Sequence, residues 1–474
     1  MTHQHFSRRD FLRSIASATG VAAAPLALNL AAAGTAAAAG ASDYKALICL
    51  YMMGGNDHYN TFLATDRTSW TEYERLRDTN DAQSIALPKD GSFGGVLPVG
   101  TATVQPGRTF AFHPQLAGLR QLYNSGRAAV VSNVGTLVQP TTREQYLANS
   151  VPLPPKLFSH NDQQAVWLSD RAEGSTVGWG GRMADLINSA NGNSSFTCIS
   201  AAGNTVFLSG RQMQQFQIAP AGAVPIEGIS GRVLGANFQL RSLIAGSHTN
   251  KLEAAHASVV SRSIDLQAQL ASAMVAAGPG GVPNPKGYVN PMTGTAAVNP
   301  LASQLQIVAR MIAAREALGM KRQVFFVSMG GFDTHDGQSR RHAALMARLD
   351  HALSYFDTTM ANLMGANVRQ QVTLFTASDF GRTLTSNGDG TDHGWGSHHF
   401  VAGGAVRGSD IYGDFPTIGL GHANDIGQGA LLPSVAVDQY GATLGRWLGL
   451  SDSELIDVFP SLVNFSQRDL GFMR

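Results

Sequence analysis

Three apolar runs in this chain are each followed closely by an aspartate, and this repeated arrangement restricts the fold more than any other feature. The runs and their aspartates are Ala46–Met53 with Asp57, Val324–Ser328 with Asp333, and Val372–Ala377 with Asp379. Short, uninterrupted apolar runs are typical of strands that are buried on both faces of a parallel sheet. Because the strands of such a sheet point the same way, we expect the three carboxylates to converge at one edge.

The rest of the chain alternates between expected strands and helices. Further strands are expected at Ala128–Val134 and Phe196–Ile199, and helices at Pro114–Ser125, Gly181–Ala190, Pro300–Met320 and Arg340–Leu363. This alternation predicts an α/β fold with a mostly parallel sheet flanked by helices. Residues 205–300 interrupt it with a helical stretch and a Gly/Pro-rich loop, and we expect them to form an insertion or lid within a domain that spans residues 43–474.

The first 39 residues are expected to be an export signal rather than part of the fold. The motif SRRDFL at residues 7–12 precedes an Ala-rich segment that ends in small residues suited to cleavage before Gly40 or Ser42. This pattern indicates twin-arginine export, with the export machinery as a partner and a periplasmic or secreted location. A membrane anchor is the alternative, but Gly, Ser, Thr and Pro residues interrupt the segment. No other run is long and apolar enough to cross a bilayer, so we expect no membrane span after cleavage.

The charge of the chain limits its expected partners, and its cysteine content limits the expected redox chemistry. The chain carries 34 basic and 33 acidic residues, a formal net charge of +1, so nothing in it predicts binding to nucleic acid or to an anionic membrane. Its two cysteines, Cys49 and Cys198, lie in apolar, strand-like surroundings. We expect buried free thiols, with a single disulfide as the alternative.

The loop after the last apolar run concentrates side chains that bind metals. Asp379 is followed within a short stretch by Asp389, Asp392, His393, His398 and His399, and Asp333 is followed by His335. Oxygen and nitrogen donors of this kind suit Zn²⁺, Mn²⁺, Mg²⁺ or Ca²⁺. For any one of these residues a polar surface loop or a helix cap is the alternative. Together they predict a shared metal site at the edge of the sheet.

Several motifs, taken in order along the chain, resemble those of a known family. They are LYMMGGNDHYNTF, FHPQLAGLRQLYNSGRAAVVSNVG, FSHNDQQAVW, GWGGRMADL, FVSMGGFDTH, TLFTASDFGRTL and GTDHGWG. With the twin-arginine signal, they resemble exported bacterial proteins of unknown function that are assigned to the alkaline-phosphatase and sulfatase superfamily. The resemblance covers nearly the whole chain after the signal. It implies an alkaline-phosphatase-like core with a helical and Gly/Pro-rich insertion.

The superfamily resemblance also implies a site. Its members hold one or two divalent ions with Asp and His and hydrolyse phosphate or sulfate esters through a Ser, Thr or modified Cys nucleophile. By position, the metal ligands would be Asp57, Asp333, His335, Asp379, His393 and His398. Two features depart from the usual pattern: Phe380 stands where a His follows the late Asp, and no Cys-x-Pro-x-Arg motif is present. The second departure argues against a standard sulfatase.

The expected nucleophile is Ser159, because superfamily nucleophiles tend to begin a helix, where free backbone N–H groups help to hold the transferred group. Thr61 is a second candidate, and a capping box between Ser159 and Asp162 is the structural alternative. Arg382 would bind a substrate oxyanion in two-pronged fashion, with an ion pair to a nearby Asp as its alternative.

These residues support two hypotheses from different classes. The first is an exported, metal-dependent hydrolase of phosphate or sulfate esters of small molecules. The second is a noncatalytic periplasmic binding or assembly protein that retains the fold with an incomplete metal site. Phe380 and the uncertain nucleophile favour the second, whereas the clustered histidines and Asp333-Thr334-His335 favour the first.

Overall fold

A computed structural model describes residues 43–89, 94–222 and 238–474 of the chain. The predicted export signal, residues 1–39, lies outside them. Among the described residues, no helix has the length and apolar character needed to cross a membrane.

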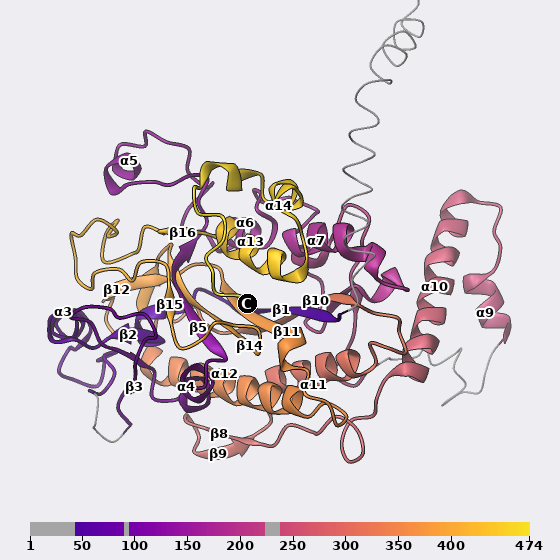
Figure 1. Cartoon of the computed structure of the whole chain (residues 1–474), viewed down its shortest axis with the longest axis horizontal. Coiled ribbons are helices and arrows are strands. Elements are labelled where there is room, and N and C mark those ends of the chain that lie inside the picture. The colour runs from indigo at the N-terminus through magenta and orange to yellow at the C-terminus, as the bar shows by residue number, and fades with distance from the viewer. Residues whose placement is uncertain (1–42, 90–93, 223–237) are drawn as a thin grey trace, which may run out of the picture.

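The described chain is built around one mixed sheet of nine strands (Figure 1). In spatial order the strands are β15 (Ile411–Tyr412), β5 (Ala128–Gly135), β14 (Ser397–Gly403), β11 (Val372–Ser378), β1 (Lys45–Met53), β10 (Arg322–Gly330), β6 (Cys198–Ser200) and β7 (Phe216–Gln217), while β16 (Val435–Ala436) pairs with β5. All pairings are parallel except the two made by β14, which is antiparallel to β11 and β5. The three predicted aspartate-bearing strands are β11, β1 and β10. They run parallel, as expected, and they are neighbours in the sheet.

Helices cover both faces of the sheet (Figure 1). One face packs against α4 (Ala117–Asn124), α11 (Pro300–Ala313) and α12 (Gln338–Ala361), and the other against α6 (His160–Ser169), α7 (Trp179–Ile187), α13 (Val437–Leu448) and α14 (Asp452–Val458). Strand β1 supplies both cores, because Ile48 and Leu50 join the first and Leu47 and Cys49 the second. The prediction of an α/β fold with a mostly parallel sheet flanked by helices is therefore confirmed. Both cysteines are buried and free, as expected.

Smaller elements surround the carboxyl ends of the parallel strands. They are the short helices α3 (Arg67–Arg77) and α5 (Arg143–Leu147), the sheet of β2 (Phe62–Ala64), β4 (Phe110–Phe112) and β3 (Leu97–Val99), and the hairpin of β12 (Arg382–Ser386) and β13 (Thr391–His393). A further hairpin, β8 (Tyr288–Asn290) with β9 (Thr295–Ala297), lies in the stretch that was predicted to be a Gly/Pro-rich loop. Tertiary contact explains this difference, since the Tyr288 hydroxyl accepts a hydrogen bond of 2.8 Å from Arg348 on α12.

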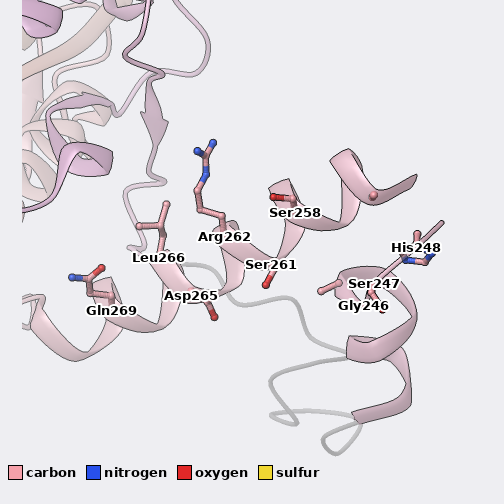
Figure 2. Close-up of a pocket in the computed structure, with 11 residues that line it drawn as sticks. Gly246, Ser247, His248, Ser258, Ser261, Arg262, Asp265, Leu266 and Gln269 are labelled. Atoms are coloured by element: carbon pink, nitrogen blue, oxygen red, sulfur yellow. The ribbon is translucent and has the colours of Figure 1, made fainter. Parts of the chain in front are cut away.

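The interruption predicted at residues 205–300 contains two helices, α9 (Phe238–Ala245) and α10 (Lys251–Ala273). They project to one side of the molecule (Figure 1), and only Ala257 and Leu270 of α10 are buried. A cavity of about 630 Å³ lies between the two helices (Figure 2), with Arg262 and Asp265 among its lining residues. Most of α10 is therefore held at the surface rather than in the core.

Candidate functional site

Three segments that are far apart in sequence meet at the carboxyl edge of the sheet. Asp333 follows β10, His160 begins α6, and His393 ends β13. One ligand atom from each of these three residues lies within 4.8 Å of the others, an arrangement that fits a metal ion. His335 adjoins them, because its Nε2 lies 3.1 Å from Asp333 Oδ1 and 2.8 Å from His393 Nε2. We call His160, Asp333, His335 and His393 the edge cluster.

Each histidine of the edge cluster has its Nδ1 bound to an oxygen acceptor. The acceptors are Asp379 for His160 at 2.8 Å, Asp392 for His335 at 3.2 Å, and the Phe158 carbonyl for His393 at 2.8 Å. A carboxylate or carbonyl oxygen only accepts, so Nδ1 carries the proton in all three rings. The lone pair of a neutral ring is then on Nε2.

All three Nε2 atoms face Asp333. They lie 3.4 Å from Oδ2 for His160 and 3.1 and 3.2 Å from Oδ1 for His335 and His393. Lone pairs that converge on a carboxylate repel it unless a proton or a cation lies between them. Oxygen acceptors behind metal-binding histidines fix the ring and its tautomer in the same way. The donor set therefore fits a divalent ion.

Burial and charge act differently on the members of the edge cluster. The hydrogen bond to Asp379 raises the pKa of His160, whereas burial lowers the pKa of His393. Burial alone would raise the pKa of Asp333, but its hydrogen bond and charge interaction with Arg382 outweigh this effect, so the pKa is lowered. The Asp333 side chain remains 44% exposed, which leaves the cluster open to solvent.

Arg382 forms an ion pair with Asp333. Its Nη1 lies 2.7 Å from Asp333 Oδ1, and its other N–H groups bind the Gly54 carbonyl and the side chain and carbonyl of Thr391. The side chain is fully buried. The ion-pair alternative for Arg382 is thus what the structure contains. Binding of a substrate oxyanion by this residue stays a prediction, and it would require the guanidinium to release some of these partners.

Asp379 supports the edge cluster from behind. Its Oδ2 accepts hydrogen bonds from His160 and from the Gly54 N–H at 3.2 Å, so it orients the His160 ring. The expected role of Asp379 as a metal ligand stays a prediction. Phe380, the residue that departs from the family pattern, is fully buried, and its ring lies 4.8 Å from the ring of His160 and 4.5 Å from that of His393. A packing side chain therefore occupies the position where the resemblance implied an imidazole ligand.

Asp57 lies in a separate, buried network. Its two oxygens bind Arg77 at 2.5 and 2.9 Å, and they also accept hydrogen bonds from Gln338 and the Tyr59 N–H. Burial by itself would raise the pKa of Asp57, but Arg77 lowers it. With its oxygens occupied in this way, Asp57 is placed as a structural ion pair and not with the edge cluster.

His398 is also separate from the edge cluster. It is fully buried on β14, and its Nδ1 accepts a hydrogen bond of 3.0 Å from the Asn133 N–H. Its ring contacts that of His58, and burial lowers the pKa of both histidines well below the usual value. An Nδ1 that accepts leaves the proton on Nε2, which does not suit a metal ligand.

Ser159 lies at the start of α6, next to His160. Its hydroxyl donates a hydrogen bond of 2.7 Å to Asp162, and within the described residues it makes no side-chain bond to the helix backbone. The capping box, which was the structural alternative for Ser159, is therefore absent there. The same Asp162 carboxylate lies 3.5 Å from Lys156 Nζ.

The sequence did not lead us to expect His160 in the cluster. The residue is part of the motif FSHNDQQAVW, in which the neighbouring Ser159 was predicted to be the functional residue. An imidazole in the first turn of a helix that follows a long loop was the available signal. Arg77 and Gln338, which bind Asp57, gave no comparable signal, because they stand at the end of α3 and the start of α12 and no local pattern connects either of them with Asp57.

Comparison with known protein families assigns the chain to one of them. The family described as "Protein of unknown function (DUF1501)" matches residues 44–458. The chain belongs to this family. No curated protein matches it in sequence.

Solved structures similar to this DUF1501 protein include sulfatases and an alkaline phosphatase. Ps i-CgsB, in complex with k-i-k-neocarrahexaose, has a TM-score of 0.36 and 10% identity over 90% of this chain and 77% of that chain. The PsFucS1 sulfatase from Pseudoalteromonas sp. has a TM-score of 0.34 and 10% identity over 94% and 77%. A variant of the alkaline phosphatase PafA has a TM-score of 0.29 and 9% identity over 73% and 64%. At these TM-scores and identities, the likeness says nothing about the chemistry of this chain.

Proposed function

We propose that this protein is an exported, metal-dependent hydrolase of phosphate or sulfate esters, with the edge cluster as its metal site. The supporting observation is that three imidazoles, each with Nδ1 bound to an oxygen, direct Nε2 toward one carboxylate. The resemblance of the motifs to the alkaline-phosphatase and sulfatase superfamily agrees with this function. Export through the twin-arginine machinery to the periplasm or the outside is part of the same proposal.

The donor set narrows the identity of the ion. Three imidazole nitrogens and one carboxylate are suited to Zn²⁺ or a similar transition-metal ion, whereas Mg²⁺ and Ca²⁺ prefer oxygen ligands. His160, His335, His393 and Asp333 would hold it. Since Asp57 and His398 are occupied elsewhere, one ion agrees better with these contacts than two.

A bound divalent ion would polarise an ester oxygen as a Lewis acid. Arg382 keeps Asp333 ionised and oriented, and Asp379 and the Phe158 carbonyl hold the proton on Nδ1 of His160 and His393. We propose Ser159 as the nucleophile, with Asp162 as the group that accepts its hydroxyl proton across the existing hydrogen bond.

A noncatalytic binding or assembly protein is the second candidate. It is favoured by the pairing of the Ser159 hydroxyl with Asp162, whose charge also attracts Lys156, and by the buried partners of Arg382. Under this hypothesis the same cluster would bind a metal weakly or not at all.

The first test is the metal content of the folded protein, purified without chelator and measured by elemental mass spectrometry. We expect about one equivalent of a transition metal in the wild type and almost none in Asp333→Asn, because the substitution removes the charged ligand that all three imidazoles face. Metal-loaded protein should then hydrolyse simple aryl phosphate or sulfate esters. A folded wild type that refuses added Zn²⁺ and Mn²⁺ would exclude the hydrolase and leave the binding protein.

A further inference from the structure

A crevice of about 400 Å³ opens beside the edge cluster. It lies at the carboxyl ends of β1 and β10 and is lined by Tyr51, Phe326 and one face of α6 that includes Asn161 and Gln164. α/β proteins bind ligands in crevices outside the carboxyl ends of their strands. None of the four residues of the edge cluster lines this crevice, so it is a distinct space.

The crevice and the edge cluster are linked through Asp379. Asn161 in the crevice directly follows His160 in the cluster, and the Gly54 N–H, directly after the crevice residue Met53, donates to the Asp379 oxygen that also binds His160. Burial raises the pKa of Tyr51, and the nearby Asp379 charge raises it further. Asp379 therefore lies between the crevice residue Tyr51 and the cluster residue His160.

The lining of the crevice selects the chemistry of its occupant. Amide side chains come from Asn161, Gln164 and Asn204, and hydroxyl groups from Thr205 and Ser328. The described lining residues include no Lys, Arg or His, and the single charged one is Glu173, whose carboxylate lies 3.8 Å from Lys156 at the exposed rim. Amide and hydroxyl groups can donate hydrogen bonds to alcohol groups and accept hydrogen bonds from them. An anionic group in the crevice would find no cation among the described lining residues, and the Glu173 carboxylate would repel it.

We propose that this crevice binds the leaving group of the ester, and that this group is an uncharged, hydroxyl-bearing alcohol such as a polyol. The inference rests on the proposed hydrolase function and adds a substrate class to it. In the overall reaction the bond between phosphorus or sulfur and the alcohol oxygen breaks, a water oxygen takes its place, and one water proton goes to the alcohol. The released product in the crevice is a neutral polyol.

Two probes that differ in one group test this assignment. Glycerol 2-phosphate and 2-phosphoglycerate differ only in the exchange of a hydroxymethyl group for a carboxylate, and the corresponding sulfate esters form a second pair. We expect metal-loaded wild type to show a higher kcat/KM for the hydroxymethyl member. Gln164→Lys places a cation in the crevice wall and should shift this preference about tenfold toward the carboxylate member.

The matched control is Ala148→Lys, which adds the same charge at an exposed position after α5 and should leave the preference unchanged. Thermal unfolding by circular dichroism checks that both variants are folded. If esters are hydrolysed but the two members react equally, or if Gln164→Lys changes the preference no more than Ala148→Lys, the crevice assignment is wrong and the hydrolase stands. If metal-loaded wild type hydrolyses aryl esters but neither pair, the crevice assignment fails and the hydrolase stands. If it hydrolyses no aryl ester and neither pair, the proposed function fails, and the assignment that rests on it fails too.

Discussion

The position of one proton on each imidazole decides what the edge cluster can bind. Asp379, Asp392 and the Phe158 carbonyl act at this scale, because each holds a proton on Nδ1 and so leaves the Nε2 lone pair free to bind the proposed ion. A residue that never touches the ion can therefore control its affinity.

Asp379 gives a direct test of this control. Asp379→Ala should weaken Zn²⁺ binding by about 10–100-fold, because His160 loses the acceptor that fixes its ring and tautomer. Competition with a chromophoric chelator measures the affinity. The control is Asp336→Ala, which removes an exposed carboxylate paired with Arg341, one residue beyond His335. Equal affinities of the two variants would show that Asp379 has no part in the site.

The Asp57–Arg77 pair leads to a prediction about stability rather than metal binding. Asp57→Asn leaves the buried Arg77 charge without its partner and should lower the free energy of unfolding by about 3–5 kcal/mol, as measured by urea denaturation. Because the pKa of Asp57 is lowered in the fold, its contribution is present at neutral pH and is lost only on acidification below the unfolded value of about 3.9.

A matched control lies on the same helix. Glu72 pairs with Arg75 at the exposed surface of α3, so Glu72→Gln should leave the unfolding free energy unchanged within error. An Asp57→Asn variant as stable as Glu72→Gln, but with reduced metal content, would instead restore Asp57 as a ligand.

At the scale of elements, Phe380, which follows β11, packs against the turn that follows β1. The Phe380 ring contacts the rings of two cluster histidines on one side, and a Cβ added to Gly55 would lie 2.3 Å from that same ring. Gly55 also has a φ of +83°, a conformation that favours glycine. The absence of a side chain at residue 55 therefore keeps the aromatic ring and the two imidazoles in place.

Gly55→Ala should displace Phe380 and weaken Zn²⁺ affinity as well as stability, because the histidine rings lose their packing support. Gly203→Ala is the matched control, since Gly203 has the same φ of +83° but no atom within 4 Å of an added Cβ. Both variants carry the backbone strain, and only the first carries the clash. Chelator competition on the two variants measures the difference, and an unchanged affinity in Gly55→Ala would contradict it.

The elements were easier to predict than the site. The runs that became β1, β10 and β11 are apolar on both faces, so their sequence alone indicated central strands. The edge cluster instead depends on which side chains the turns bring to face one another. Asp333, His335 and His393 were predicted and lie together. Asp57 is equally acidic and also follows a strand, but it forms an ion pair with Arg77 instead. This pair joins two separate segments, and no local sequence pattern specifies it.

At the scale of the whole molecule, five histidines of the described residues are buried in the protein interior with lowered pKa values: His58, His113, His342, His398 and His399. Burial is the main cause in each, and it lowers the pKa of His342 to about 4 and that of His399 to about 3. The unfolded chain binds protons at these rings near pH 6.5, whereas the folded chain does not. Acid therefore favours unfolding.

The free energy of unfolding should fall steadily as the pH falls from about 6.5 toward 5, with His342 alone contributing about 2 kcal/mol over this interval. Urea denaturation at several pH values measures the slope. His342→Gln keeps a hydrogen-bond donor toward Asn56 and should flatten the slope, since one titrating group is removed. A wild-type stability that is constant over this interval would contradict the prediction.

The ligands of the edge cluster stand on three chain segments, at residues 160, 333 and 393. Without an ion, hydrogen bonds such as that between His393 Nδ1 and the Phe158 carbonyl hold these segments together. A bound ion would couple the three segments, because none of them could move away without breaking a coordination bond. The free energy of local unfolding at each segment would then rise with the ion concentration. Amide hydrogen exchange in the first turn of α6 would then report whether an ion is held by side chains more than 170 positions further along the chain.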